Sequence, residues 1–175
     1  MIDFNDYQER AITTKIYSDE IGVPYVVLGI IGEVGEFIEK MKEVEDEFEK
    51  DLLTKEIGDV YWYLAGFFSE IEKNMGDHIQ FTKTLLAVDD AIEIIMIAPA
   101  QLAELTKKFL RDEYPNQMSA ERFEKIVKLI QQLHDAMYFL CSEYQVNLED
   151  VLEANIAKLQ SRKDRGTLGG DGDTR

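Results

Sequence analysis

Prolines are rare in this chain, and their scarcity constrains its fold more than any other feature. Only Pro24, Pro99 and Pro115 occur among the 175 residues, and proline is the residue that most strongly breaks a helix interior. Between the prolines, apolar residues recur at the three- and four-residue spacing of amphipathic helices, and no segment shows the alternation of a strand. The sequence therefore predicts an all-α fold, most simply an antiparallel helical bundle.

Capping residues and turn-forming segments bound the expected helices. Asp3 or Asn5 can cap a first helix that runs to about Tyr17, and "SDEIGVP" is expected to form a loop closed by Pro24. Pro99 is expected to kink or restart the helix that contains it. The glycine-rich tail, residues 166–175, is expected to be loose unless a ligand orders it. The remaining helices are expected over residues 25–49, 52–74, 77–88, 89–112, 120–144 and 148–160, the last two capped by Ser119 and Asn147.

Charge and cysteine content exclude several classes of protein. The formal net charge is −16 at pH 7, which argues against a general binder of nucleic acids or anionic membranes. A single cysteine, Cys141, rules out an internal disulfide and fits a reducing compartment. The opening "MIDFNDYQER" lacks a signal-peptide core, and the longest apolar run, around "IIMIAPA", is judged too short to span a bilayer. We expect one cytoplasmic domain over residues 1–175, with no nucleic-acid or membrane partner.

Two parts of the chain are similar to each other. Setting "IIGEVGEFIEK" over "APAQLAELTKK" aligns Glu33 with Gln101, and setting "EIGDVYWYLA" over "QLHDAMYFLC" aligns Glu56 with Gln132. The small residues and the spacing of apolar residues are kept in the second segment. Each of its two helices keeps one acidic residue and has glutamine in place of the other. We interpret this as two copies of one helical hairpin, the second degraded; chance similarity between amphipathic helices is the alternative. The segments are an acid-bearing copy in 1–74, a degraded copy in 77–145, a C-terminal helix in 146–165 and the tail.

Two pairs of acidic residues lie inside apolar helical runs. They are Glu33 with Glu36, and Glu56 with Asp59, each pair at the three-residue spacing that places side chains on one helix face. Two antiparallel helices could bring all four carboxylates together. At an effective dielectric constant of about 20, two like charges about 4 Å apart repel by about 4 kcal/mol, so such a group would take up protons or hold cations. All-oxygen ligands favour Mg²⁺, or Mn²⁺ in its place, over zinc.

Glycines beside these acids favour a metal site over the alternative interpretation, which is an ordinary solvated helix face. Gly32, Gly35 and Gly58 would serve no purpose on a wet face, and each interior glycine costs a helix about 1 kcal/mol relative to alanine. We expect these glycines to let helices approach closely enough for short acidic side chains to share an ion.

The acid motifs resemble those of the all-α nucleoside triphosphate pyrophosphatases, the MazG-like proteins. "GEVGEFIEK" followed by "EIGDVYWYLA" is similar to their signature, Glu-Glu-x-x-Glu and then Glu-x-x-Asp. "DYQERA" and the segment from "NLEDVLEANIAKLQ" onward resemble the ends of short members, so the likeness covers about residues 3–70 and 138–175. The resemblance implies an all-α bundle, Mg²⁺ dependence, and hydrolysis of a (deoxy)nucleoside triphosphate to monophosphate and pyrophosphate by in-line attack of water. We also expect a homo-oligomer, most simply a dimer.

The resemblance also implies roles for single residues. Gly32 stands where the signature has its first glutamate, so the identity of the general base is open, with Glu33 or Glu36 as candidates. Tyr63 is expected to contact the base or sugar, with core packing as its alternative. The basic end of the last helix is expected to contact phosphate, with compensation of the helix dipole as the alternative. The expected metal ligands are Glu33, Glu36, Glu56 and Asp59, and the expected substrate contacts are Tyr63, Asn155, Lys158, Arg162 and Arg165.

Two further functions remain as alternatives. The first is a catalytically silent MazG-like module that binds nucleotide and metal without hydrolysis. The second is a carboxylate-bridged iron protein in a helical bundle, which would need Glu-x-x-His pairs. Neither His78 nor His134 lies at that spacing from a glutamate, so the sequence disfavours the second alternative.

Overall fold

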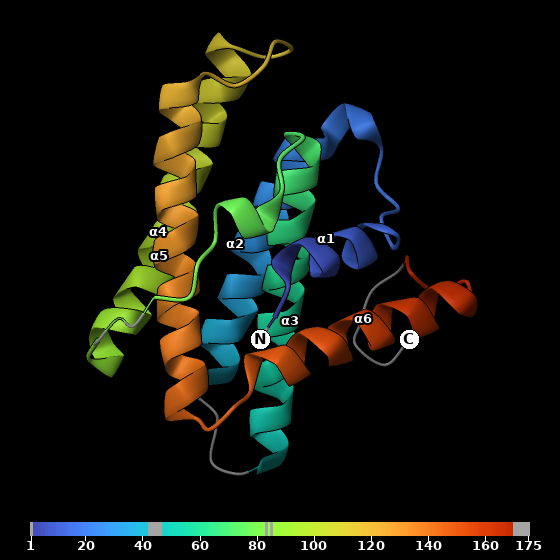
Figure 1. Ribbon diagram of the computed structural model, residues 1–175, viewed down its shortest axis with the longest axis vertical. Coiled ribbons are helices and arrows are strands. Elements are labelled where there is room, and N and C mark those ends of the chain that lie inside the picture. The colour runs from blue at the N-terminus through green and yellow to red at the C-terminus, as the bar shows by residue number, and fades with distance from the viewer. Residues whose placement is uncertain (1, 42–46, 83, 85, 170–175) are drawn as a thin grey trace.

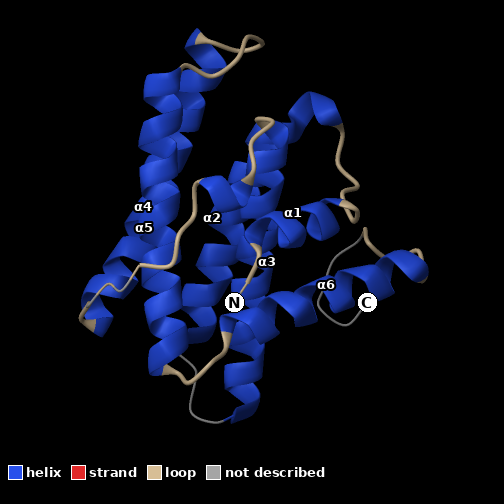
Figure 2. Ribbon diagram, viewed as in Figure 1, coloured by secondary structure: helices blue, strands red, loops and turns tan. Residues whose placement is uncertain are grey.

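The computed structural model describes residues 2–41, 47–82, 84 and 86–169, and of residues 47–52 only the helical backbone. Throughout this part of the chain the regular structure is helical, without a strand (Figure 2). The all-α prediction is therefore confirmed. In chain order the elements are α1 (Phe4–Ile12), η1 (Asp19–Ile21), α2 (Gly22–Met41), α3 (Glu47–Glu70), η2 (Met75–Asp77), α4 (Val88–Asp112), α5 (Ala120–Glu143) and α6 (Leu148–Asp164).

Two helical hairpins form the bundle, and two shorter helices lie across it. Helix α2 packs along α3, α4 packs along α5, and α2 joins the two hairpins by packing on α4 (Figure 1). Helices α1 and α6 cross α3 and contact each other. One continuous apolar core links all these elements, and burial of its side chains is the main force that holds them together. Its largest fully buried members include Phe37, Tyr61, Phe67, Phe68, Leu64, Ile95 and Leu102.

Local hydrogen bonds explain where the first two helices begin and end. Asp3 caps α1, because its carboxylate accepts from the backbone N–H groups of Asn5 and Asp6. The helix ends at Ile12 rather than near Tyr17, because the hydroxyls of Thr13 and Thr14 donate to the last carbonyls at 2.7 Å each. Helix α2 begins earlier than expected, so that Pro24 lies within its first turn, where a missing N–H costs nothing.

Helices α4, α5 and α6 follow the sequence expectations closely. Helix α3 instead runs from Glu47 to Glu70, so residues 47–49 belong to α3 and not, as expected, to the end of the preceding helix. Ser119 and Asn147 occupy the N-cap positions of α5 and α6, as expected. Pro99 lies buried inside a continuous α4, so the helix does not restart there. The acidic residues 42–46 and the tail residues 170–175 lie outside the described residues.

The helix expected over residues 77–88 is wrong. After η2 the described residues 78–82, 84, 86 and 87 lie outside any helix, and side chains of α5 contact part of them. There Gln80 exchanges two backbone hydrogen bonds with the side-chain amide of Gln131, at 2.9 and 2.8 Å. Thr82 donates to Asp135 at 2.6 Å. Side chains of α5 thus provide hydrogen-bond partners for part of this segment, so the segment does not need the internal hydrogen bonds of a helix.

The length of one apolar stretch of the chain contradicts a further expectation. Residues 19–41, covering η1 and α2, are long and apolar enough to cross a membrane by length and composition, and they are the one such stretch in the part described. In the structure α2 packs against α3 and α4. The expectation that no apolar run reaches a membrane-spanning length is therefore wrong, and a cytoplasmic location stays a prediction.

Candidate metal centre

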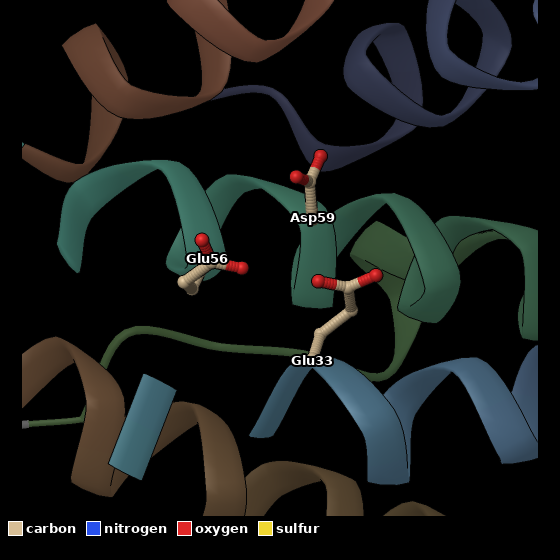
Figure 3. Close-up of side chains that lie close together, drawn as sticks. All are labelled: Glu33, Glu56 and Asp59. Carbon is tan, nitrogen blue, oxygen red and sulfur yellow. The ribbon is translucent and has the colours of Figure 1, made fainter. Parts of the chain in front are cut away.

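Three acidic side chains converge where α2 packs against α3. Glu56 and Asp59 lie one turn apart on α3, and Glu33 reaches toward them from α2 (Figure 3). Each of the three offers a carboxylate oxygen within 4.8 Å of the others. We call these three residues the acid cluster. The antiparallel packing of the two helices thus brings together three of the four residues predicted to bind metal.

The fourth predicted ligand, Glu36, lies on the exposed side of α2. It is outside the set of oxygens that lie within 4.8 Å of one another. Its charge nevertheless contributes to raising the pKa of Glu33. Glu36 therefore stands at the solvent edge of the acid cluster rather than within it.

Burial and mutual repulsion control the charge of the acid cluster. The pKa of Glu33 is raised to about 8, first by burial, then by the charges of Asp59 and Glu56 and by a hydrogen bond to Glu56. In the metal-free protein Glu33 therefore holds a proton at neutral pH. A carboxyl group that must take up a proton marks a place where additional positive charge would be favourable.

Two lysines neutralise the other members of the cluster. Lys40 of α2 forms an ion pair with Glu56, whose side chain is almost fully buried. Lys158 of α6 donates to both carboxylate oxygens of Asp59, at 2.7 and 2.6 Å. The sequence reasoning identified Lys158 but missed Lys40. The sequence contains part of the signal, because Lys40 follows Glu33 by seven residues, two helical turns along the same face, but it does not specify the partner on α3.

Asn155 fixes α6 against the acid cluster. Its side chain is buried, and its amide donates to Asp59 at 2.7 Å. The hydroxyl of Tyr7 lies 3.4 Å from the Asn155 amide oxygen, to which it donates. A Cβ at Gly58 would lie 2.9 Å from the Asn155 Cβ. Gly58 therefore does permit a close helix approach, although the approaching helix is α6 rather than α2.

The expectation for Gly32 and Gly35 is wrong. Both are exposed, and a Cβ added at either would meet no atom within 4 Å. Beyond the first turn of α2, the glycine without room for a Cβ is Gly29, where a Cβ would lie 2.2 Å from the ring of Tyr63. Gly29 and Glu33 are one turn apart on the side of α2 that faces α3, whereas positions 32 and 35 turn toward solvent.

The aromatic residues next to the cluster have different environments. Tyr63, one turn beyond Asp59, is half-buried, and its ring lies 6.1 Å from that of Tyr25. Burial is the main reason that the pKa of Tyr63 is raised, followed by its interaction with Tyr25 and then by the Glu33 and Asp59 charges. Trp62 instead donates to the Ala11 carbonyl at 3.0 Å, which is a packing role.

The remaining predicted substrate contacts lie farther along α6. Arg162 is buried one turn after Lys158. Arg165 is exposed at the end of the helix, where its Nε donates to the Ser161 carbonyl at 3.2 Å. At about 1.5 Å per residue, Arg162 lies about 6 Å along the axis from Lys158.

The second hairpin places the neutral counterparts of the acids together. Gln101 of α4 and Gln132 of α5 line one hollow of about 340 Å³. The aligned apolar positions are also alike, since Ile30 and its counterpart Ala98 are both buried. These positions are consistent with two copies of one hairpin, and the division of the chain into copies stays a prediction.

Comparison with known proteins gives one informative similarity. No protein-family model matches the chain, and no solved structure matches it significantly. The chain is similar to the Gene 37 protein of Mycobacterium phage L5, with 34% identity over 79 residues. The match covers 38% of this chain and 69% of the phage protein. The name of that relative states no activity.

Proposed function

We propose that this chain, which belongs to the same family as the Gene 37 protein of Mycobacterium phage L5, is a Mg²⁺-dependent nucleoside triphosphate pyrophosphohydrolase. Its products would be a (deoxy)nucleoside monophosphate and pyrophosphate. The observation that carries the proposal is the acid cluster of Glu33, Glu56 and Asp59, with the amide and ammonium donors of α6 beside it. The resemblance of the acid motifs to MazG-like pyrophosphatases supports the choice of reaction.

The residues present fit a hard divalent cation. The cluster offers only carboxylate oxygens, at least one of them on a fully buried side chain. Mg²⁺ is usually held by a few carboxylates together with waters and substrate phosphates. When bound, the cation would stabilise negative charge that develops on the phosphoryl oxygens. Mn²⁺ would serve as a substitute.

The side chains around the cluster suggest how the chain handles the substrate. Lys158 and Asn155 would bind phosphate oxygens, because both already donate to an anionic oxygen. Glu33, when ionised, would accept the proton of the attacking water, since its carboxylate lies beside the two others that would hold the cation. Tyr63 would form a wall for the base or sugar, and Arg162 and Arg165 would contact the outer phosphates.

A second candidate is a nucleotide-binding module without hydrolytic activity. One observation favours it: Gly32, at the position of the first signature glutamate, is exposed and supplies no acid. Such a module would bind Mg²⁺ and nucleotide at equilibrium and release no pyrophosphate. The two candidates therefore differ in a single product measurement.

The deciding experiment is a panel of ribo- and deoxynucleoside triphosphates with Mg²⁺, in which pyrophosphate and orthophosphate are measured separately. We expect pyrophosphate release, and a loss of about a hundredfold or more in kcat/KM for Glu56→Gln and for Asp59→Asn. The matched controls are Glu104→Gln and Asp135→Asn in the second hairpin, which should remain near wild type. Folded wild-type protein that binds nucleotide but releases no pyrophosphate would favour the silent module.

A further inference from the structure

Lysine ammonium groups occupy the positions around the acid cluster where positive charge is needed. Lys40 approaches Glu56 from α2, and Lys158 approaches Asp59 from α6. The two lysines therefore reach the cluster from different helices. Their side chains are 22% and 23% exposed, whereas that of Glu56 is only 3% exposed. Lys40 is thus held at the solvent boundary of a more deeply buried carboxylate, whereas Lys158 and Asp59 are exposed to nearly the same extent.

The charge count depends on which cations are present. With Glu33 protonated, as in the metal-free protein at neutral pH, the two lysines balance the charges of Glu56 and Asp59. A divalent cation that replaced the proton of Glu33 would leave one positive charge in excess. The cation and the lysines would also repel each other, because they would share carboxylate oxygens that lie within 4.8 Å. An anion beside the cluster would relieve that repulsion.

We propose that Lys40 and Lys158 are exchangeable counter-ions, which pair with Glu56 and Asp59 in the metal-free protein and turn to phosphate oxygens of the substrate when a divalent cation binds. Lysine suits this exchange, since it carries a compact charge with three donors on a flexible stem. The inference rests on the proposed function. It adds Lys40 as a substrate-binding residue and predicts that cation and phosphate reinforce each other's binding.

The reinforcement has a quantitative consequence. If the cation increases the affinity for phosphate by some factor, phosphate must increase the affinity for the cation by the same factor. Lys40 contributes to that factor in two ways. It competes with the cation for Glu56, and it binds the anion once it is displaced. Removing its charge should therefore tighten cation binding and weaken anion binding, a combination that loss of a purely structural residue would not produce.

The test compares Lys40→Met with Lys55→Met, a matched control that removes an exposed lysine of α3 next to Glu56 in the sequence. Mn²⁺ binding is measured by calorimetry, and binding of inorganic phosphate is measured with and without saturating Mn²⁺. For Lys40→Met we expect Mn²⁺ to bind about tenfold more tightly and phosphate, at saturating Mn²⁺, about tenfold more weakly. Lys55→Met should change neither affinity by more than about twofold. Lys40→Arg, which keeps the charge, should retain the phosphate affinity.

Stability provides a second readout, because Lys40→Met leaves a buried carboxylate without its ion pair. Mn²⁺ should raise the melting temperature of Lys40→Met by more than it raises that of the wild type. Lys158→Met, whose ion pair is more exposed, repeats the binding test if Lys40→Met folds poorly. Unchanged or weaker Mn²⁺ binding in both variants would overturn the exchange while leaving the hydrolase proposal intact. Wild-type protein that does not bind Mn²⁺ would overturn both.

Discussion

The side chain of His134 is enclosed by aromatic rings in the core. Its Nδ1 lies 2.6 Å from the hydroxyl of Tyr61, and the ring is stacked with Tyr138 and meets Phe4 and Phe81 edge-on. Its Nε2 is buried without a partner among the described residues. Burial lowers the pKa of His134 to about 4, so the imidazole stays neutral in the folded protein.

His134 should make the protein less stable in mild acid. The unfolded histidine takes up its proton near pH 6.5 and the folded one near pH 4. The unfolded state therefore binds more protons between these values, and the free energy of unfolding should fall as the pH decreases from about 6.5 to 4, by about 3 kcal/mol in total. His134→Gln should lose this dependence, as measured by urea unfolding at several pH values. Parallel curves for variant and wild type would contradict the expectation.

Glu33 should have the opposite effect in the metal-free protein. Its pKa is about 8 when folded and near 4.5 when unfolded, so between these values the folded state binds more protons. The stability that comes from protonated Glu33 is present below about pH 4.5 and is lost as the pH rises toward 8. We expect Glu33→Gln to unfold at higher urea concentration than wild type at pH 8, with a smaller difference at pH 5. An equal difference at both pH values would contradict the role given to Glu33.

At the scale of the helices, two glycines of α2 provide a matched pair of substitutions that tests how α2 packs against α3. A Cβ at Gly32 would meet no neighbour within 4 Å, whereas a Cβ at Gly29 would overlap the Tyr63 ring. Gly32→Ala should therefore stabilise the protein by about 0.5–1 kcal/mol through helix propensity alone. Gly29→Ala should destabilise it, because the ring and its neighbours must move. Urea unfolding of both variants measures the difference, and equal effects would show that α2 and α3 pack differently.

The helices were largely predictable because their signals are local. Caps at Asp3 and Asn147 and apolar spacing depend only on nearby residues, and the structure contains the helices that they predict. The connection after η2 was not predictable, since its backbone bonds to side chains more than fifty positions away, such as Gln131. A sequence pattern that spans only a few residues contains no information about a partner so far away in the chain.

The same distinction applies to the acid cluster. Three-residue spacing, with antiparallel packing of the two helices, predicted that Glu56 and Asp59 share a face and meet Glu33, but it also placed Glu36 in the group, which the structure does not. Spacing did not show which side of α2 each glycine occupies, so Gly32 was assigned to a helix contact in place of Gly29. It also did not show that Lys40 reaches across to Glu56, because that contact depends on the register between α2 and α3.

At the scale of the whole molecule, α2 and α4 expose apolar residues at aligned positions of the two hairpins. Leu28 is 68% exposed and its counterpart Met96 is 57% exposed. The neighbouring Gly32 and Gly35 are also exposed, so another chain could approach α2 closely. These features agree with the predicted homodimer, which stays a prediction.

Association can be measured by light scattering coupled to size-exclusion chromatography. We expect a dimer for the wild type and a shift toward monomer for Leu28→Glu, because a buried charge would oppose the contact. Ile16→Glu, at an exposed apolar residue between α1 and η1, is the matched control and should leave the dimer unchanged. A monomeric wild type, or an equal effect of both substitutions, would exclude α2 as the contact.

The most direct test of the central claim is anomalous diffraction from crystals grown with Mn²⁺. The claim is that carboxylates from α2 and α3 converge closely enough to bind a divalent cation between them. We predict an anomalous peak among the carboxylate oxygens of Glu33, Glu56 and Asp59, with Lys40 and Lys158 displaced from their present partners. Crystals at saturating Mn²⁺ with no peak there, and with both lysine ion pairs intact, would contradict it.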